Sequence, residues 1–276
     1  MYSTKTIILG TLIAFVFWLP SGCTTQEQPE IRIAGSTTTL PFMVKVSEQY
    51  SETRKLHLSG GGSIKGVSEL IDGKINIAMS SAVISGKTRS HAESAGVQMK
   101  GFPFAGDLIV PIAHPSNPIN TLSLTQLRAI YEGKIKSWNE LGGPVEFIQV
   151  VTRRESSGTE KVWKEVVMKS GNIRPGAVLQ SSNSGILAYI AENRSAIGYI
   201  SYALLNPEVK PLSVNGIAPN RENAEEGKYP ISRRLYLYVD EKNFPHDIKS
   251  LIIFILSQKG QKIAEECGFI PLDPLN

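Results

Sequence analysis

Short apolar runs alternate along the chain with longer stretches in which apolar residues recur at helical spacing. The apolar runs predict strands at residues 31–34, 56–58, 75–79, 108–113, 147–151, 197–200 and 235–239. The amphipathic stretches predict helices at residues 41–50, 64–71, 122–131, 159–168, 185–192 and 248–266. Strands that alternate with helices are typical of α/β proteins, so we expect an α/β fold built mainly on parallel sheets.

The first 22 residues have the pattern of a signal peptide. Lys5 is followed by an uncharged apolar segment at residues 7–19, which at about 13 residues is shorter than the roughly 20 that span a bilayer. Two small residues then precede Cys23, which resembles the lipobox of bacterial lipoproteins, although Pro20 stands where that motif usually has leucine. We expect Cys23 to carry the lipid and residues 23–29 to form a tether. The alternative is an ordinary secretory signal with an incidental cysteine.

Composition narrows the functional classes. The 276 residues are 41% hydrophobic and 20% charged, which excludes disordered and fibrous chains. The net charge of +4 is too small and too dispersed to indicate a nucleic-acid surface. Two cysteines cannot form a disulfide framework, and the four histidines lie far apart in the sequence, so we expect no metal site and no cofactor. Cys267 near the C-terminus is expected to fill a core position.

Three predicted strands run into turns of one chemistry. These turns, each followed by a predicted helix, have the sequences GSTTT at residues 35–39, SGGGS at 59–63 and TRRESSGT at 152–159. Unpaired N–H groups and the positive dipole end make a helix N-terminus favourable for anions, glycine permits close approach, and hydroxyls add donors. Ser and Thr caps are common at helix starts and explain any single turn. Three such turns, one of them with arginines, favour an anion site.

Several enzyme motifs are absent. The segment GGGSIKG at residues 60–66 has Lys65 where a dinucleotide fingerprint needs its third glycine, and the GKT at 86–88 lacks the first glycine of a P-loop because Ser81 occupies that position. No serine lies at the centre of a G-x-S-x-G turn. The motifs therefore give no positive indication of an enzyme.

The same turns resemble those of the periplasmic-type phosphate-binding proteins of ABC transporters. The resemblance rests on the turns at residues 35–38, 60–63 and 153–159. Further similar segments are IAMSS at 77–81, YEGKI at 131–135, AIGY at 196–199, YPISR at 229–233 and LSQKGQ at 256–261. These matches follow one another in order over nearly all of residues 31–272, which makes the combination far more specific than any one Gly/Ser turn.

The resemblance implies a two-lobed clamshell with its ligand in the cleft between the lobes. It places residues 30–108 and 235–276 in lobe I and residues 109–234 in lobe II. Two crossing strands near residues 108–113 and 234–239 would form the hinge. The family's phosphate-binding residues match Thr37, Thr38, Ser63, Ser81, Arg153, Ser157, Gly158 and Thr159.

Charge and selectivity at the implied site depend on a few positions. Arg153 can offer a bidentate fork to an oxyanion. Glu155 matches a family acid that pairs with this arginine, and an exposed carboxylate at the helix start is the alternative. Ser81 departs from family members that have an aspartate there to accept the ligand's proton. If Asp107 or a backbone carbonyl takes that role, we expect sulfate to be rejected; if neither does, sulfate should compete.

Together these observations predict an extracytoplasmic, lipid-anchored binding protein that captures inorganic phosphate and delivers it to the permease subunits of an ABC transporter. It would not be an enzyme. One alternative is a receptor or sensor for another tetrahedral oxyanion. The other is a secreted phosphate-ester hydrolase, which would need a nucleophile with a base or a metal site that the motifs do not show.

Overall fold

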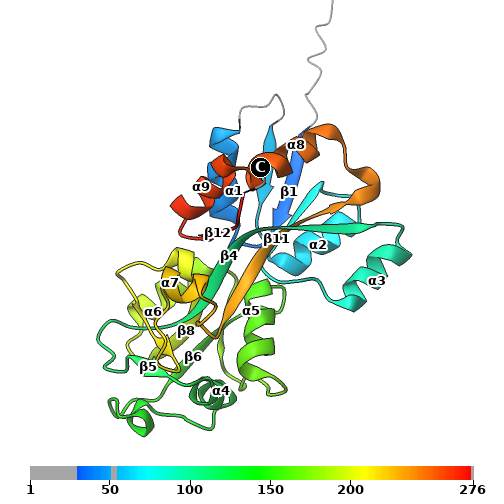
Figure 1. Cartoon of the computed structure of the whole chain (residues 1–276). Helices are drawn as coiled ribbons and strands as arrows, with labels where there is room; N and C mark the ends of the chain where they lie inside the picture. The colour runs from blue at the N-terminus through cyan, green and yellow to red at the C-terminus, as the bar shows by residue number, and fades with distance from the viewer. Residues whose placement is uncertain (1–29, 51–54, 275–276) are drawn as a thin grey trace, which may run out of the picture.

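The computed structural model describes residues 30–50 and 55–274 (Figure 1). The predicted signal peptide, Cys23 and the whole predicted tether at residues 23–29 therefore lie outside the described residues. Within the described ranges, no helix is both long and apolar enough to cross a membrane.

The described chain alternates strands with helices, which confirms the α/β prediction. The strands are β1 Ile31–Gly35, β2 Leu56–Ser59, β3 Ile77–Ser80, β4 Met99–Ala113, β5 Thr121–Leu122, β6 Gln149–Arg153, β7 Val178–Gln180, β8 Ala196–Ser201, β9 Lys210–Pro211, β10 Ser213–Val214, β11 Ser232–Asp240 and β12 Ile270–Pro271. The α-helices are α1 Leu40–Gln49, α2 Ser63–Ile71, α3 Gly86–Ser94, α4 Leu124–Glu132, α5 Gly158–Trp163, α6 Asn183–Glu192, α7 Arg221–Glu225, α8 His246–Leu256 and α9 Gln258–Glu266.

One mixed sheet runs through the molecule in the order β2-β1-β3-β11-β4-β8-β6-β7. The pairs toward its two ends are parallel, whereas every pair that includes β4 or β11 is antiparallel. In Figure 1, β4 and β11 cross the middle of the molecule and connect its upper and lower halves. Parallel pairing therefore characterises the two halves, and antiparallel pairing characterises their connection.

The two long central strands differ from the predicted hinge segments. β4 has 15 residues, and its first part pairs with β11 from Met99 opposite Asp240 to Leu108 opposite Ser232. Its last part, Ile109 to Ala113, pairs instead with β8. The predicted segments 108–113 and 234–239 are thus not paired with each other. Only the apolar end of β4 was recognised in the sequence, because its first half includes glycines and a proline.

Apolar side chains are buried in separate clusters in the two halves. One cluster combines the last part of β4 with β6, β8 and helices α4, α5 and α6, and at its centre the rings of Trp163 and Tyr199 stack at 4.1 Å. In the other half, β3 lies between two clusters. Ile77 and Met79 face α1, α8 and α9, while Ala78 faces α2 and α3. Helices thus cover both faces of the sheet in that half, as parallel pairing requires.

Each predicted strand and helix overlaps an observed element, but one predicted helix is divided, and helices α3 and α7 were not predicted. The predicted helix 248–266 is divided at Ser257, which has an extended backbone and accepts a hydrogen bond from the Gly260 N–H to cap α9. Helix α3 was not predicted, because it has only Ala92 as a buried residue and so shows no apolar periodicity. Cys267 packs against the cluster beneath α8 and α9 but is only half-buried. The expectation of a core position is therefore met only in part.

Gly66 offers a test of how tightly α2 packs on β1. A Cβ atom at Gly66 would lie 2.6 Å from the carbonyl oxygen of Ala34 and 2.6 Å from the Cα of Gly35, which are backbone atoms that cannot rotate away. We expect Gly66→Ala to lower the free energy of unfolding by about 1–3 kcal/mol, measured by urea denaturation. The matched control is Gly86→Ala, because a Cβ at this exposed position in α3 would meet no atom within 4 Å. Equal stability of the two variants would contradict this close packing.

Candidate functional site

The three glycine- and serine-rich turns meet at one place between the two halves of the molecule. They connect β1 to α1, β2 to α2 and β6 to α5. The first two turns are joined because the N–H of Gly62 donates to the carbonyl oxygen of Gly35 at 2.8 Å. The second and third are joined because the N–H of Ile64 donates to the carbonyl oxygen of Ser156 at 3.1 Å. Three helix N-termini therefore converge at this place.

Glycine is required where the second and third turns touch. Gly62 has φ 102°, and a Cβ there would lie 2.6 Å from the carbonyl oxygen of Ser156. A Cβ on Gly158 would lie 2.5 Å from Ser63 Oγ and 2.7 Å from Ser81 Oγ. Both glycines therefore let backbone approach backbone or hydroxyl groups closely.

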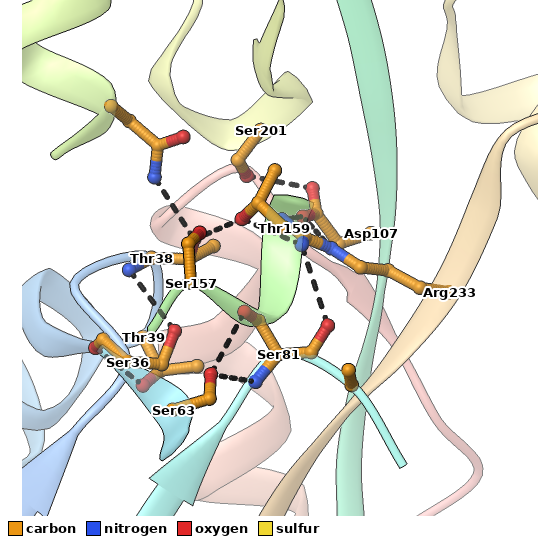
Figure 2. A network of polar contacts seen from close by, with 12 residues as sticks. Ser36, Thr38, Thr39, Ser63, Ser81, Asp107, Ser157, Thr159, Ser201 and Arg233 are labelled. Carbon is orange, nitrogen blue, oxygen red and sulfur yellow. Dashed lines mark hydrogen bonds and ion pairs between the residues drawn. The ribbon is translucent and has the colours of Figure 1, made fainter. Parts of the chain in front are cut away.

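The predicted hydroxyl residues contact one another across this junction (Figure 2). Thr38 Oγ1 and Thr159 Oγ1 are 3.3 Å apart, and Ser63 Oγ and Ser81 Oγ are also 3.3 Å apart. The Ser81 N–H donates to Ser63 Oγ at 3.1 Å. Ser157 Oγ caps α5 by accepting from the Glu160 N–H at 3.4 Å. These side chains come from both halves, so the hydroxyl cluster bridges the molecule.

Arg153 ends β6 with its guanidinium buried in the same cluster. Its Nη2 donates to Thr37 Oγ1 at 3.1 Å and to the carbonyl oxygen of Ser181 at 2.9 Å. Its Nε and Nη1 are buried and have no hydrogen-bond partner in the described part of the chain. Burial lowers the pKa of the Arg153 guanidinium to about 10, so the group remains cationic at neutral pH. A buried cation with two unused donors is complementary to an anion.

All eight residues predicted for the site lie in this region. Seven are buried and Thr37 is half-buried. The set is Thr37, Thr38, Ser63, Ser81, Arg153, Ser157, Gly158 and Thr159.

The acid expected beside Arg153 is a different residue. The side chain of Glu155 is 91% exposed and lies 3.6 Å from Lys164 Nζ, so the predicted pairing of Glu155 with Arg153 was wrong. Glu155 lies in the turn just before α5, so it matches the alternative of an exposed carboxylate at the helix start. Glu160 instead is buried and pairs with Lys164 at 3.0 Å. Burial raises the pKa of the Glu160 carboxyl, and its negative charge favours the charged form of Arg153.

A buried ion pair lies beside the hydroxyl cluster, next to Thr159, as Figure 2 shows. Arg233 on β11 donates from Nε and Nη2 to Asp107 Oδ2 at 2.9 and 2.6 Å. Asp107 Oδ1 accepts from Ser201 Oγ at 2.7 Å. Arg233 Nη1 also donates to Thr159 Oγ1 at 2.8 Å and to the carbonyl oxygen of Ser81 at 3.3 Å. Both oxygens of Asp107 are therefore engaged, although burial raises the pKa of this carboxyl.

Asp107 therefore does not offer a free acceptor in place of the family's aspartate at position 81. A role for Asp107 as that acceptor does not fit the geometry, because its oxygens already accept from Arg233 and Ser201. The side chain of Asp107 is fully buried on β4.

Sequence reasoning missed three polar residues that support this cluster. Asn183 Nδ2 donates to Thr38 Oγ1 at 2.9 Å, Arg233 contacts Thr159, and Ser201 contacts Asp107. No spacing rule connects them to the turns, because they lie on α6, β11 and β8. The YPISR segment that ends in Arg233 was part of the resemblance, but it assigned Arg233 no role.

The chemistry of the cluster is that of hydrogen-bond donors and a cation. Among residues 30–50 and 55–274, no three or more His, Cys, Asp or Glu side chains come together where they could hold a metal ion. An oxyanion is the ligand class for which buried hydroxyls, helix N-termini and an arginine provide complementary groups.

Comparison with known proteins agrees with the fold. The model of the PBP superfamily domain matches residues 22–259. This chain belongs to the PBP superfamily. Its fold is similar to the phosphate-bound structure of a putative phosphate ABC transporter substrate-binding protein from Clostridium perfringens, with a TM-score of 0.83 and 31% identity over 88% of this chain and 100% of that one.

The names of two further relatives also refer to phosphate transport or phosphate binding. The structure of an ABC-type phosphate transport receptor from Vibrio cholerae has a TM-score of 0.73 and 28% identity over 88% of this chain and 100% of that one. The phosphate-binding protein PstS of Bacillus subtilis (strain 168) is 28% identical over 250 residues, which cover 88% of this chain and 80% of the relative. The clamshell-type α/β fold implied by the resemblance is thus confirmed.

The buried ion pair should stabilise the protein mainly as a unit. We expect Asp107→Leu and Arg233→Met each to lower the free energy of unfolding by about 3–5 kcal/mol, because each substitution leaves one buried charge without its partner. The double variant should lose less than the sum, because it leaves neither charge. Denaturant unfolding of the four proteins gives the double-mutant cycle, and additive losses would contradict coupling through the Asp107–Arg233 contact.

Proposed function

We propose that this protein captures inorganic phosphate between its two halves and delivers it to the permease of an ABC transporter. The observation that carries the proposal is Arg153, a buried cation with two nitrogens, Nε and Nη1, that have no hydrogen-bond partner among the described residues. It lies among hydroxyl groups from both halves of the molecule. The names of the relatives from Clostridium perfringens, Vibrio cholerae and Bacillus subtilis all include phosphate, which supports the same ligand.

The geometry explains how a phosphate would be held once it leaves water. Each charge-assisted hydrogen bond contributes on the order of 1.5–3 kcal/mol, so several are needed to replace the hydration of the anion. Arg153 would supply a fork of donors. Thr38, Ser63, Ser157 and Thr159 would supply hydroxyls. The N–H groups at the starts of the three helices would saturate the remaining oxygens.

The two halves would act as lobes that close on the ligand. We assign residues 30–108 and 235–276 to lobe I and residues 109–234 to lobe II, with β4 and β11 as the hinge. The separate hydrophobic clusters of the two halves support this division. The contact between Ile64 and Ser156 supports closure, because it joins α2 of lobe I to the turn before α5 in lobe II. A ligand that bonds to both lobes would favour the closed form.

The site is suited to binding rather than catalysis. Among the described residues, the site hydroxyls bond to other hydroxyls, to backbone groups and to the side chains of Asn183, Arg153 and Arg233. A hydrolase would need a nucleophile bonded to a base, and none of these contacts is with a histidine or carboxylate side chain. We therefore favour a receptor over the phosphate-ester hydrolase.

Delivery to a permease requires the receptor to work outside the cytoplasm. We place it at the outer side of the membrane, with the lipid anchor at Cys23 and residues 23–29 as the tether. The signal-like segment that precedes Cys23 supports this location.

Arg153 is the residue whose loss should most weaken phosphate binding. We expect Arg153→Ala to cost about 2–5 kcal/mol of binding free energy, by analogy with buried charge pairs at interfaces. Isothermal titration with phosphate measures the change. Arg154→Ala is the matched control, because Arg154 is the exposed neighbouring arginine and should leave the affinity unchanged.

A folded Arg153→Ala protein with wild-type phosphate affinity would remove Arg153 from the site. Titration of the wild type with sulfate, arsenate and molybdate tests the alternative of another oxyanion. An assay of phosphate-ester turnover on the same preparation tests the hydrolase alternative.

Attachment to the membrane is tested at Cys23. We expect the mature wild-type protein to begin with an acylated Cys23 and to fractionate with membranes, because several acyl chains anchor a protein stably. Cys23→Ser should block this maturation and leave the protein without lipid. Mass spectrometry of the mature N-terminus is the measurement. An unmodified Cys23, or cleavage at another position, would show that Pro20 is incompatible with lipidation here.

A further inference from the structure

The buried region around Arg153 contains unused groups of both hydrogen-bonding types. Among the residues that the structure describes, Arg153 Nε and Nη1 are buried donors without a partner, and Asn183 Oδ1 is a buried acceptor without a partner. Asn183 is only 1% exposed. A buried acceptor without a hydrogen bond is destabilising, so such an atom calls for an explanation. A ligand that has both acceptor oxygens and one hydrogen would satisfy all three atoms.

Asn183 is held beside the proposed phosphate site. It is the first residue of α6, and its Nδ2 donates to Thr38 Oγ1 at 2.9 Å. Because Oδ1 and Nδ2 belong to the same amide group, Oδ1 also lies close to Thr38. Ser182 caps α6 by accepting from the Gly185 N–H at 3.0 Å, and the carbonyl oxygen of Ser181 accepts from Arg153. The short segment at residues 181–183 therefore holds Asn183 and also contacts the Arg153 guanidinium.

Other acceptors near the site are already in use. Asp107 accepts from Arg233 and Ser201 through both of its oxygens. The carbonyl oxygens of Ser81 and Ser181 accept from Arg233 and Arg153 respectively. Asn183 Oδ1 is thus the acceptor left over among these groups.

We propose that Asn183 Oδ1 accepts the hydrogen of a protonated phosphate oxygen and so determines selectivity for hydrogen phosphate over fully ionised oxyanions. This inference rests on the proposed function and assigns to a neutral amide the role that a carboxylate at position 81 has in some family members. Sulfate carries no proton at neutral pH. A sulfate oxygen would therefore face the lone pairs of Oδ1, while Asn183 Nδ2 donates to Thr38 Oγ1.

The physical basis of this selectivity is the cost of leaving Oδ1 unpaired. A site built to bond a ligand hydroxyl rejects analogues without it far more strongly than a site that differs only in shape, because the buried group then has no partner. An amide also adds no negative charge beside the anion, so it can recognise the proton without repelling the rest of the ligand. Arg153 thus provides affinity for any oxyanion, and Asn183 provides discrimination.

Fluorophosphate is the sharpest probe, because fluorine replaces the hydroxyl of hydrogen phosphate and leaves a dianion of similar shape without a proton. Phosphate, sulfate and fluorophosphate are titrated by calorimetry at mildly alkaline pH, where phosphate is mostly the hydrogen phosphate dianion. For the wild type we expect phosphate to bind at least about 100-fold more tightly than either of the other two. Wild-type protein that binds all three alike overturns the inference and leaves the proposed function intact. Wild-type protein that binds no phosphate overturns the proposed function itself.

Substitutions at Asn183 separate recognition of the proton from general support of the site. Asn183→Ala should weaken phosphate binding and reduce the preference for phosphate over fluorophosphate at least about tenfold, because the acceptor is gone. Asn183→Asp keeps an acceptor and should retain the preference. Asn193→Ala is the matched control, since Asn193 follows the other end of α6 and its side chain bonds only to the Tyr189 carbonyl oxygen among the described contacts.

The ratio of affinities is the deciding quantity, because a loss of positioning at Thr38 would weaken all three anions equally. An Asn183→Ala protein that folds as the wild type by thermal unfolding, yet keeps the wild-type ratio, would overturn the role of Oδ1. Loss of the ratio in Asn193→Ala would do the same.

Discussion

The buried positive charge of Arg153 is the constraint on which the arrangement of this protein depends. A guanidinium at the end of a strand, out of contact with water, is costly unless negative charge or acceptor atoms surround it. Within residues 30–50 and 55–274, the guanidinium has two acceptors, Thr37 and the carbonyl oxygen of Ser181, and two of its nitrogens are left unused. The rest of the site makes sense as a set of groups that an oxyanion would complete.

The Asp107–Arg233 pair solves a different electrostatic problem. Arg233 is a second buried arginine close to the proposed anion site, but the Asp107 carboxylate compensates its charge. Arg233 can therefore support the hydroxyl of Thr159 and the loop at Ser81 without adding to the net charge of the cleft. The pair lies on β4 and β11, the strands that connect the two halves, so the connection and the site share one hydrogen-bond network.

Much of the fold could be predicted because apolar periodicity reflects burial directly. The elements that escaped prediction have weak periodicity: α3 buries a single residue, and the first half of β4 is interrupted by glycines and a proline. The division of the last helix at Ser257 was also missed, because apolar residues continue on both sides of the break. The Ser/Thr/Gly turns could be identified because each lies next to its own helix.

The sequence by itself determined the local chemistry of this protein: three strand-to-helix turns with donors, one of them containing Arg153, and an α/β alternation that places such turns at strand ends. Tertiary structure decided which partners those groups have. Asp107, Asn183 and Arg233 lie on β4, α6 and β11, and only the crossing of β4 and β11 between the two halves brings them behind the turns. Hydrogen bonds are short-ranged and directional, so partners far apart in the chain leave no periodic signal in the sequence.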